Sequence, residues 1–255
     1  MKKILCLLLA AVMLLSMTAC GGEPEETKAP KETTEPTVAT TAVPETEPAT
    51  EPTTEPATEP VTEPVTEPAT EPEQTNPVLG VINGNTYENQ YFGFGCELDS
   101  SWYVATKEEI AQIMGLTSDV LNDGGFELQL ETSGVAYGLY AMKGDGLTSL
   151  NMVVENLGLL YSLTMDEKTY AETAAKQLPD AFAAMGMTDV KAEVVTISFA
   201  GKDHVAITLE ANMNGIMFYE TLVCVKAANY IAVITAGSYQ ENTTKDILNG
   251  FYEVK

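Results

Sequence analysis

The chain has 255 residues and a formal net charge of −24 at pH 7, and its 13 Lys and Arg residues are all Lys. Arg supplies the bidentate contacts that proteins make with phosphate groups, so an acidic chain without Arg is a poor binder of nucleic acid or anionic lipid. We therefore expect no nucleic-acid partner.

The amino terminus has the features of an export signal. Lys2 and Lys3 precede an uncharged apolar segment at residues 4–15, which is short for a transmembrane helix and typical of a signal peptide. The following MTAC sequence resembles the lipobox of bacterial lipoproteins, which implies cleavage before Cys20 and a lipid on its sulfur. We predict that residues 1–19 are a lipoprotein signal peptide and that Cys20 anchors the chain on the extracytoplasmic face of the cell membrane. The alternatives are a secreted protein without lipid and a retained transmembrane anchor.

A linker rich in Thr, Glu and Pro follows Cys20. Residues 21–77 contain 14 Glu, two Lys, 12 of the 13 Pro and no aromatic residue, and residues 46–72 repeat Thr-Glu-Pro-x with a period of four. Such a segment has too little apolar surface to fold, and its Pro residues and like charges extend it. We predict a disordered tether over residues 20–77, which suits a domain held out through the cell wall of a Gram-positive bacterium.

The remaining 178 residues, 78–255, are long enough for one domain with its own core. Its first clear strand covers residues 92–98, where alternation places Phe92, Phe94 and Cys96 on one apolar face. Cys224 lies in a strand that is apolar on both faces. The sequence favours two buried free thiols, and a Cys96–Cys224 disulfide remains the alternative.

Capping boxes, in which Ser or Thr is followed by Glu three residues later, predict three helices. The boxes begin at Thr106, Thr164 and Ser238. Pro179 is expected to kink or divide the second helix. Phe251 is expected to belong to the apolar stripe of the third.

Apolar runs between these helices predict an antiparallel sheet. Asn-Gly at residues 214–215 is a strong hairpin signal, and turns are also expected at residues 201–202 and 228–229. The predicted fold class is α+β, an antiparallel sheet flanked by helices. Strands are expected at residues 135–143, 150–156, 194–199, 204–211, 216–226 and 230–237.

The opening of the domain resembles a known family. It is similar to the PsbP-like domains found in lipoproteins of anaerobic Gram-positive bacteria, and the likeness covers nearly all of residues 85–255. The resemblance implies a PsbP-like fold and a role as a binding or assembly subunit, and it implies no catalytic residues. It is carried by Tyr87, Asn89, Phe92, Gly93, Phe94, Leu98, Trp102, Glu108 and Glu109.

Motifs for catalysis or cofactor binding are absent from the sequence. His204 is the only His, so a multi-His metal site is excluded, and there is no C-x-x-C, H-E-x-x-H, G-x-S-x-G or Walker motif. The acidic sequence at residues 122–127 lacks the spacing of a calcium loop and predicts a turn. We expect no metal and no cofactor, and Trp102, Tyr103 and His204 remain as candidate ligand-facing residues.

These features favour a non-enzymatic surface lipoprotein whose domain binds an envelope protein or a cell-wall ligand. Its contact with the membrane is expected through the lipid on Cys20. The alternatives are an envelope hydrolase that uses carboxylates and an accessory solute-binding subunit.

Overall fold

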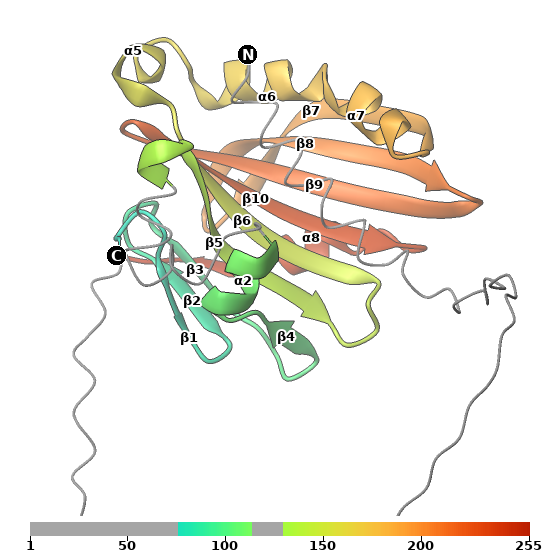
Figure 1. The fold of residues 1–255 in the computed structure, drawn as a ribbon, viewed down its shortest axis with the longest axis horizontal. Coiled ribbons are helices and arrows are strands. Elements are labelled where there is room, and N and C mark those ends of the chain that lie inside the picture. Colours follow the sequence, from blue (N-terminus) through green and yellow to red (C-terminus); the bar gives the residue numbers. More distant parts are fainter. Residues whose placement is uncertain (1–75, 114–129) are drawn as a thin grey trace, which may run out of the picture. The chain divides into compact units, whose positions relative to one another are not determined.

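The fold is that of a computed structural model, which describes residues 76–113 and 130–255 (Figure 1). The predicted signal peptide, Cys20 and the Thr-Glu-Pro repeats lie outside the described residues, as does the predicted turn at residues 122–127. The described residues form antiparallel sheets with a few helices, so the predicted α+β class is confirmed. None of their helices is long and apolar enough to cross a bilayer.

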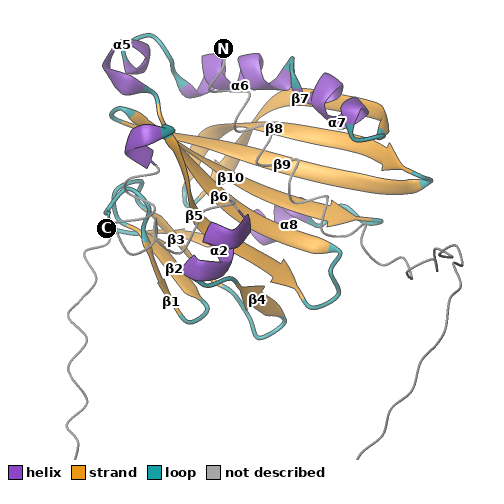
Figure 2. Cartoon of the chain, in the orientation of Figure 1, coloured by secondary structure: helices purple, strands orange, loops and turns teal. Residues whose placement is uncertain are grey.

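The larger sheet consists of seven antiparallel strands, and it includes the six strands predicted above (Figure 2). Its third predicted strand begins earlier than expected, at Thr188 instead of Val194, and β4 was not predicted. In spatial order the strands are β4 (Trp102–Val104), β5 (Val135–Lys143), β6 (Thr148–Asn156), β10 (Tyr230–Tyr239), β9 (Ile216–Ala227), β8 (Lys202–Met213) and β7 (Thr188–Phe199).

Tight turns connect β7 to β8, β8 to β9 and β9 to β10, as predicted. Asn214 and Gly215 both have positive φ angles, of 54° and 90°, which is the geometry that a two-residue hairpin loop requires. The other two turns likewise contain a residue with positive φ, Gly201 and Ala228. The hairpin signals in the sequence therefore fix the order of four adjacent strands.

A smaller sheet contains β1 (Val81–Asn83), β2 (Thr86–Asn89), β3 (Phe94–Glu97) and β11 (Phe251–Glu253), in that order. The predicted strand at 92–98 is shorter than expected, but Phe92, Phe94 and Cys96 are all buried as predicted.

Two of the residues that carry the resemblance, Tyr87 and Asn89, attach β2 to the segment that precedes β1. The Tyr87 hydroxyl donates to the Leu79 carbonyl at 2.9 Å, and Asn89 Nδ2 donates to the Val78 carbonyl at 2.9 Å. Both side chains are buried. Tyr87 and Asn89 are thus structural residues, because they satisfy buried backbone carbonyls.

The first two capping boxes have different outcomes. At α2 (Lys107–Ile113), Glu109 N donates to Thr106 Oγ1 and Thr106 N donates to Glu109 Oε2, so this box is confirmed. The second prediction is wrong at its start, because Asp166 caps the helix by accepting from Thr169 N at 2.7 Å. Pro179 divides the helix as predicted, into α6 (Glu167–Ala175) and α7 (Leu178–Ala184). A further short helix, α5 (Gly158–Ser162), was not predicted.

The predicted start of the third helix at Ser238 is wrong. Ser238 belongs to β10, where it pairs with both β6 and β9, and the helix α8 covers Thr244–Leu248. Phe251 is not part of a helical stripe, since it pairs with Cys96 in the smaller sheet. The backbone pairing of β10 with β6 and β9 continues through Ser238, the position where the capping box predicted the start of a helix.

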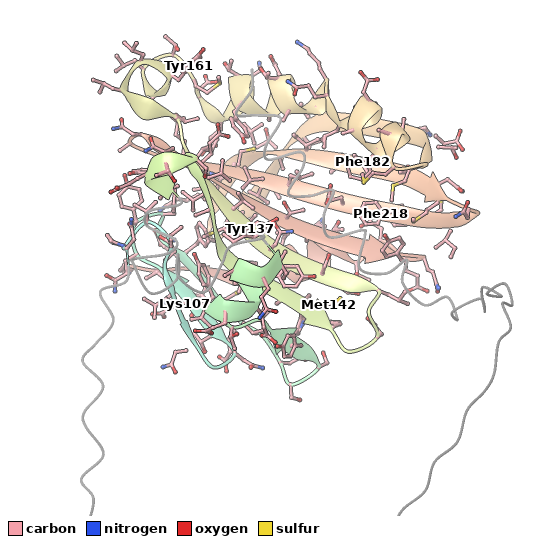
Figure 3. All side chains as sticks on the ribbon, in the orientation of Figure 1. Lys107, Tyr137, Met142, Tyr161, Phe182 and Phe218 are labelled. Carbon is pink, nitrogen blue, oxygen red and sulfur yellow. The ribbon has the colours of Figure 1, made fainter. Side chains whose placement is uncertain are left out.

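The two faces of the larger sheet have separate cores. One core joins the smaller sheet to β5 and β6, and its aromatic centre includes Phe94, Phe199 and Phe251. The other lies beneath α6 and α7, on the face that we call the helix-covered face (Figure 1). There Phe182 and Phe218 stack with ring centroids 5.9 Å apart (Figure 3).

Both cysteines of the described residues are free and buried, as the sequence favoured. Cys96 belongs to the core beneath the smaller sheet and Cys224 to the core of the helix-covered face.

Candidate functional site

A pocket of about 350 Å³ opens where the two sheets meet α8. Strand β3 and the loop after it form one side, the paired strands β4 and β5 contribute one residue each, and the segment around α8 closes the other side. The pocket is lined by residues 96–99, Trp102, Lys143, Thr243, Asp246, Ile247 and Gly250.

The charged side chains of the pocket are three carboxylates and one ammonium. Lys143 Nζ lies 5.4 Å from the centre of the Trp102 ring, within the range of a cation–π contact. Trp102 is buried in β4, and the antiparallel register places Lys143 directly opposite it. The carboxylates of Glu97, Asp99 and Asp246 complete the polar part of the wall.

Asp99 shapes the loop between β3 and β4. Its carboxylate accepts from the backbone N–H of Ser101 at 2.7 Å and also from the Ser101 hydroxyl, while Trp102 N donates to the Asp99 carbonyl at 3.1 Å. These bonds to Ser101 lower the pKa of Asp99 below its usual range. Asp99 is therefore ionised at neutral pH, and the turn presents Trp102 to the pocket.

Tyr103 is exposed and does not line the pocket. Because successive side chains of a strand point to opposite faces, Tyr103 points away from Trp102. Its hydroxyl donates to the Glu109 carboxylate on α2. Its observed role is to tie β4 to the first turn of that helix.

His204 also lies outside the pocket lining, in a second polar cluster at the start of α6. Glu167 Oε1 lies 3.1 Å from His204 Nδ1 and accepts from the Lys226 backbone N–H at 2.9 Å. The pairing of β8 with β9 begins at Val205 and Cys224, so the carboxylate occupies the point where the two strands separate. Glu167 attaches α6 to the sheet, and we call this cluster the Glu167 latch.

The pKa of Glu167 is lowered in spite of its partial burial. Burial alone raises the pKa of a carboxyl, and the hydrogen bonds from His204 and from the Lys226 backbone outweigh it. The latch therefore holds an ionised carboxylate whose Oε1 atom already accepts hydrogen bonds from His204 and from the Lys226 backbone.

The helix-covered face contains two further acidic residues. Tyr170 on α6 donates its hydroxyl to Glu155 Oε2 at 3.0 Å, and both residues are buried. Glu220 is buried as well, and its Oε2 has no hydrogen-bond partner among the described residues. Burial raises the pKa of Glu220 to about 8.

Neither thiol has the environment of a nucleophile. Burial raises the pKa of Cys96 to about 12, and it raises the pKa of Cys224 as well. A reactive cysteine needs an exposed thiol with a lowered pKa. Within residues 76–113 and 130–255, no group of three His, Cys, Asp or Glu side chains is arranged to hold a metal ion.

A separate apolar surface lies on α5 and on Leu163, the residue that follows it. The side chains of Leu159, Leu160, Tyr161 and Leu163 are largely exposed, and Figure 3 shows Tyr161 on this helix. None of them lines the pocket.

Of the three candidate ligand-facing residues, the structure brings only Trp102 to the pocket. Lys143 and Asp246 were missed because they are distant from Trp102 in sequence, and Glu97 was missed although it lies only a few residues before Trp102. The one available signal was the unique Trp of the chain.

The fold and the pocket define an α+β domain with a small, acid-lined surface site. No protein-family model matches the sequence, and no curated protein matches it either. Among solved structures, the chain is similar to LpqN of Mycobacterium tuberculosis, described as involved in cell envelope biogenesis, with 7% identity and a TM-score of 0.32, over 64% of this chain and 83% of that one.

The extracellular domain of PknH from Mycobacterium tuberculosis is similar with 13% identity and a TM-score of 0.22, over 56% of this chain and 87% of that one. Similarities with TM-scores this low support no conclusion about the function of this chain. The resemblance to PsbP-like domains stays a prediction.

Proposed function

We propose that this chain is a lipid-anchored extracytoplasmic protein whose α+β domain is a binding module, and that its ligand site is the Trp102 pocket. One observation carries the proposal: the pocket combines the Trp102 ring with two exposed carboxylates, Glu97 and Asp246, that pair with no residue the structure describes. Small-ligand sites have this character, a concave surface of roughly 300–1,000 Å³ with an apolar wall and a few polar groups.

The location of the protein is supported by its amino terminus. The apolar segment at residues 4–15 and the lipobox-like sequence before Cys20 support export and lipidation, and the Thr-Glu-Pro linker supports a domain held away from the membrane. The resemblance to PsbP-like domains of surface lipoproteins agrees with this placement. Metabolic labelling with a lipid precursor tests it, since the label should enter the wild type and be lost from Cys20→Ala.

The hydrolase alternative is less favoured by the same pocket. Acid catalysis by a carboxyl requires a raised pKa, so that the group holds a proton at neutral pH. The pKa of Asp99 is lowered, and Glu220, whose pKa is raised, is buried and does not line the pocket. An accessory solute-binding role would use the same pocket, with a small solute as its ligand. This role stays an alternative function.

The unique Trp makes the binding proposal testable in the full-length chain. Incorporation of 5-fluorotryptophan gives one ¹⁹F resonance, which reports on the pocket alone. We expect this resonance to shift or broaden when solubilised cell envelope of the producing bacterium is added. Retention of the chain on envelope material with no change in the ¹⁹F resonance would place binding elsewhere and contradict the proposal.

A further inference from the structure

Two carboxylates of the Trp102 pocket form no ion pair or side-chain hydrogen bond with the residues that the structure describes. Glu97 and Asp246 are both exposed, and neither forms an ion pair or a side-chain hydrogen bond with another described residue. Asp99 differs, because Ser101 holds its carboxylate. The pocket therefore presents two exposed carboxylates, besides Asp99, whose charge Lys143 offsets in part.

The single ammonium of the pocket is placed on the aromatic ring. Lys143 Nζ lies over the Trp102 ring, and it forms no ion pair with a described carboxylate. A Trp face is the most favourable aromatic surface for a cation. Lys143 thus marks the position that a second, external ammonium group would favour.

A polar atom in the pocket wall is also without a partner. Thr243 Oγ1 is buried and has no hydrogen-bond partner among the described residues, and Thr243 lines the pocket. A buried hydroxyl without a partner costs free energy, which a ligand donor at this position would recover.

We propose that the Trp102 pocket binds a primary ammonium group of its ligand, which displaces the Lys143 ammonium from the ring. Glu97 and Asp246 neutralise the incoming charge, Trp102 supplies the face on which the cation rests, and Thr243 accepts a hydrogen bond. The inference rests on the proposed function, since it names the ligand chemistry of the same site. Anionic ligands are disfavoured by the same arrangement, because three carboxylates and one ammonium line the described part of the pocket.

The test uses the full-length chain labelled with 5-fluorotryptophan and two blocked tri-lysine peptides. The first peptide has free side-chain ammonium groups and the second has acetylated side chains, so the two differ mainly in charge. We expect a saturable ¹⁹F shift with the first peptide only. Asp246→Asn and Glu97→Gln should each weaken its affinity about fivefold, as expected for the loss of one charge partner.

The variant Lys143→Met tests the displacement directly. Met keeps the apolar stem and removes the competing ammonium, so affinity for the tri-lysine peptide should rise about fivefold. Lys245→Met, a change of an exposed Lys on α8, is the control for net charge and should leave affinity unchanged. Unchanged or weaker binding by Lys143→Met would overturn the displacement.

The outcomes separate this inference from the proposed function. Two outcomes would overturn the ammonium proposal and leave the proposed binding site intact. One is equal binding of the acetylated peptide, and the other is no response to tri-lysine while envelope extract still shifts the resonance. No response to either peptide or to the extract overturns both.

Discussion

Two regions of the domain contain acidic side chains, and they differ in what surrounds the carboxylates. At the Trp102 pocket, Glu97 and Asp246 are exposed, and neither pairs with a residue in the part of the chain that the structure describes. On the helix-covered face and in the Glu167 latch, Glu155 and Glu167 accept hydrogen bonds that join α6 to the sheet. Both regions reflect the acidic composition of the chain. Of these carboxylates, only Glu97 and Asp246 at the pocket are exposed to a ligand.

The largest expected effect concerns Glu220, which is buried on the helix-covered face. Its pKa is raised to about 8, whereas an unfolded Glu has a pKa of about 4.3. Between these values the folded chain holds a proton that the unfolded chain has released, so the free energy of unfolding should fall by about 1.4 kcal/mol per pH unit as pH rises. The fall should end above about pH 8.

Urea unfolding of the full-length chain at several pH values measures this slope. Glu220→Gln cannot titrate and should lose the slope, while Glu210→Gln, an exposed position on the neighbouring strand, should retain it. A slope that persists in Glu220→Gln would assign the pH dependence to another group.

The second effect concerns the Glu167 latch. Glu167→Ala should lower the free energy of unfolding by roughly 2 kcal/mol, because it removes the acceptor of the Lys226 N–H and of His204. The pKa of Glu167 is lowered in the folded state, so its contribution is complete above the unfolded value of about 4.3 and is lost as pH falls through the folded value. Chemical denaturation at neutral and acidic pH measures the loss of stability in Glu167→Ala and the dependence of this loss on pH.

Glu172→Ala is the matched control on the same helix. Its carboxylate is exposed and pairs with Lys168 at 3.8 Å, so its loss should cost less than about 0.5 kcal/mol. Equal losses for the two variants would mean that the latch does not stabilise the fold.

The third effect separates binding from stability at the pocket. Asp246→Asn should change the free energy of unfolding by less than about 1 kcal/mol, because Asp246 is an exposed residue in the first turn of α8. Asp180→Asn, in the first turn of α7, should have the same small effect. Only Asp246→Asn should weaken the ¹⁹F response of Trp102 to envelope extract. A loss of response in both variants would remove the distinction between the two regions.

The smallest expected effect concerns the linker. Deletion of residues 46–72 should leave the free energy of unfolding unchanged, because a segment poor in apolar residues contributes nothing to the core. Access of an added protease to the domain on intact cells should decrease. Unfolding of the domain after this deletion would contradict the description of the segment as a tether.

The sequence predicted elements whose signals are local. The Thr106 capping box and the Asn214-Gly215 turn depend on residues within a few positions, and the structure confirms both. The prediction at Ser238 failed because its strand pairs with β9 on one side and with the distant β6 on the other, and that pairing outweighs a local helix signal. Tertiary pairing is not visible in a single sequence.

The pocket was predictable only in part for the same reason. Trp102 was predicted as a candidate ligand-facing residue, but its neighbours Lys143 and Asp246 reach it through strand register and through the packing of α8. His204 attracted attention as the unique His, and the structure gives its ring a partner in the Glu167 latch. The sequence therefore identified one pocket residue, Trp102, and one residue of the structural framework, His204.

Carboxyl footprinting of the full-length chain tests the central distinction most directly. A carbodiimide with glycine ethyl ester modifies accessible carboxylates, and mass spectrometry locates them with and without envelope extract. We predict that Glu97 and Asp246 react in the free protein and are protected by the extract, whereas Glu155 and Glu220 react in neither state. Modification of Asp246 to the same extent in both states, or modification of Glu220 in the folded protein, would contradict the account.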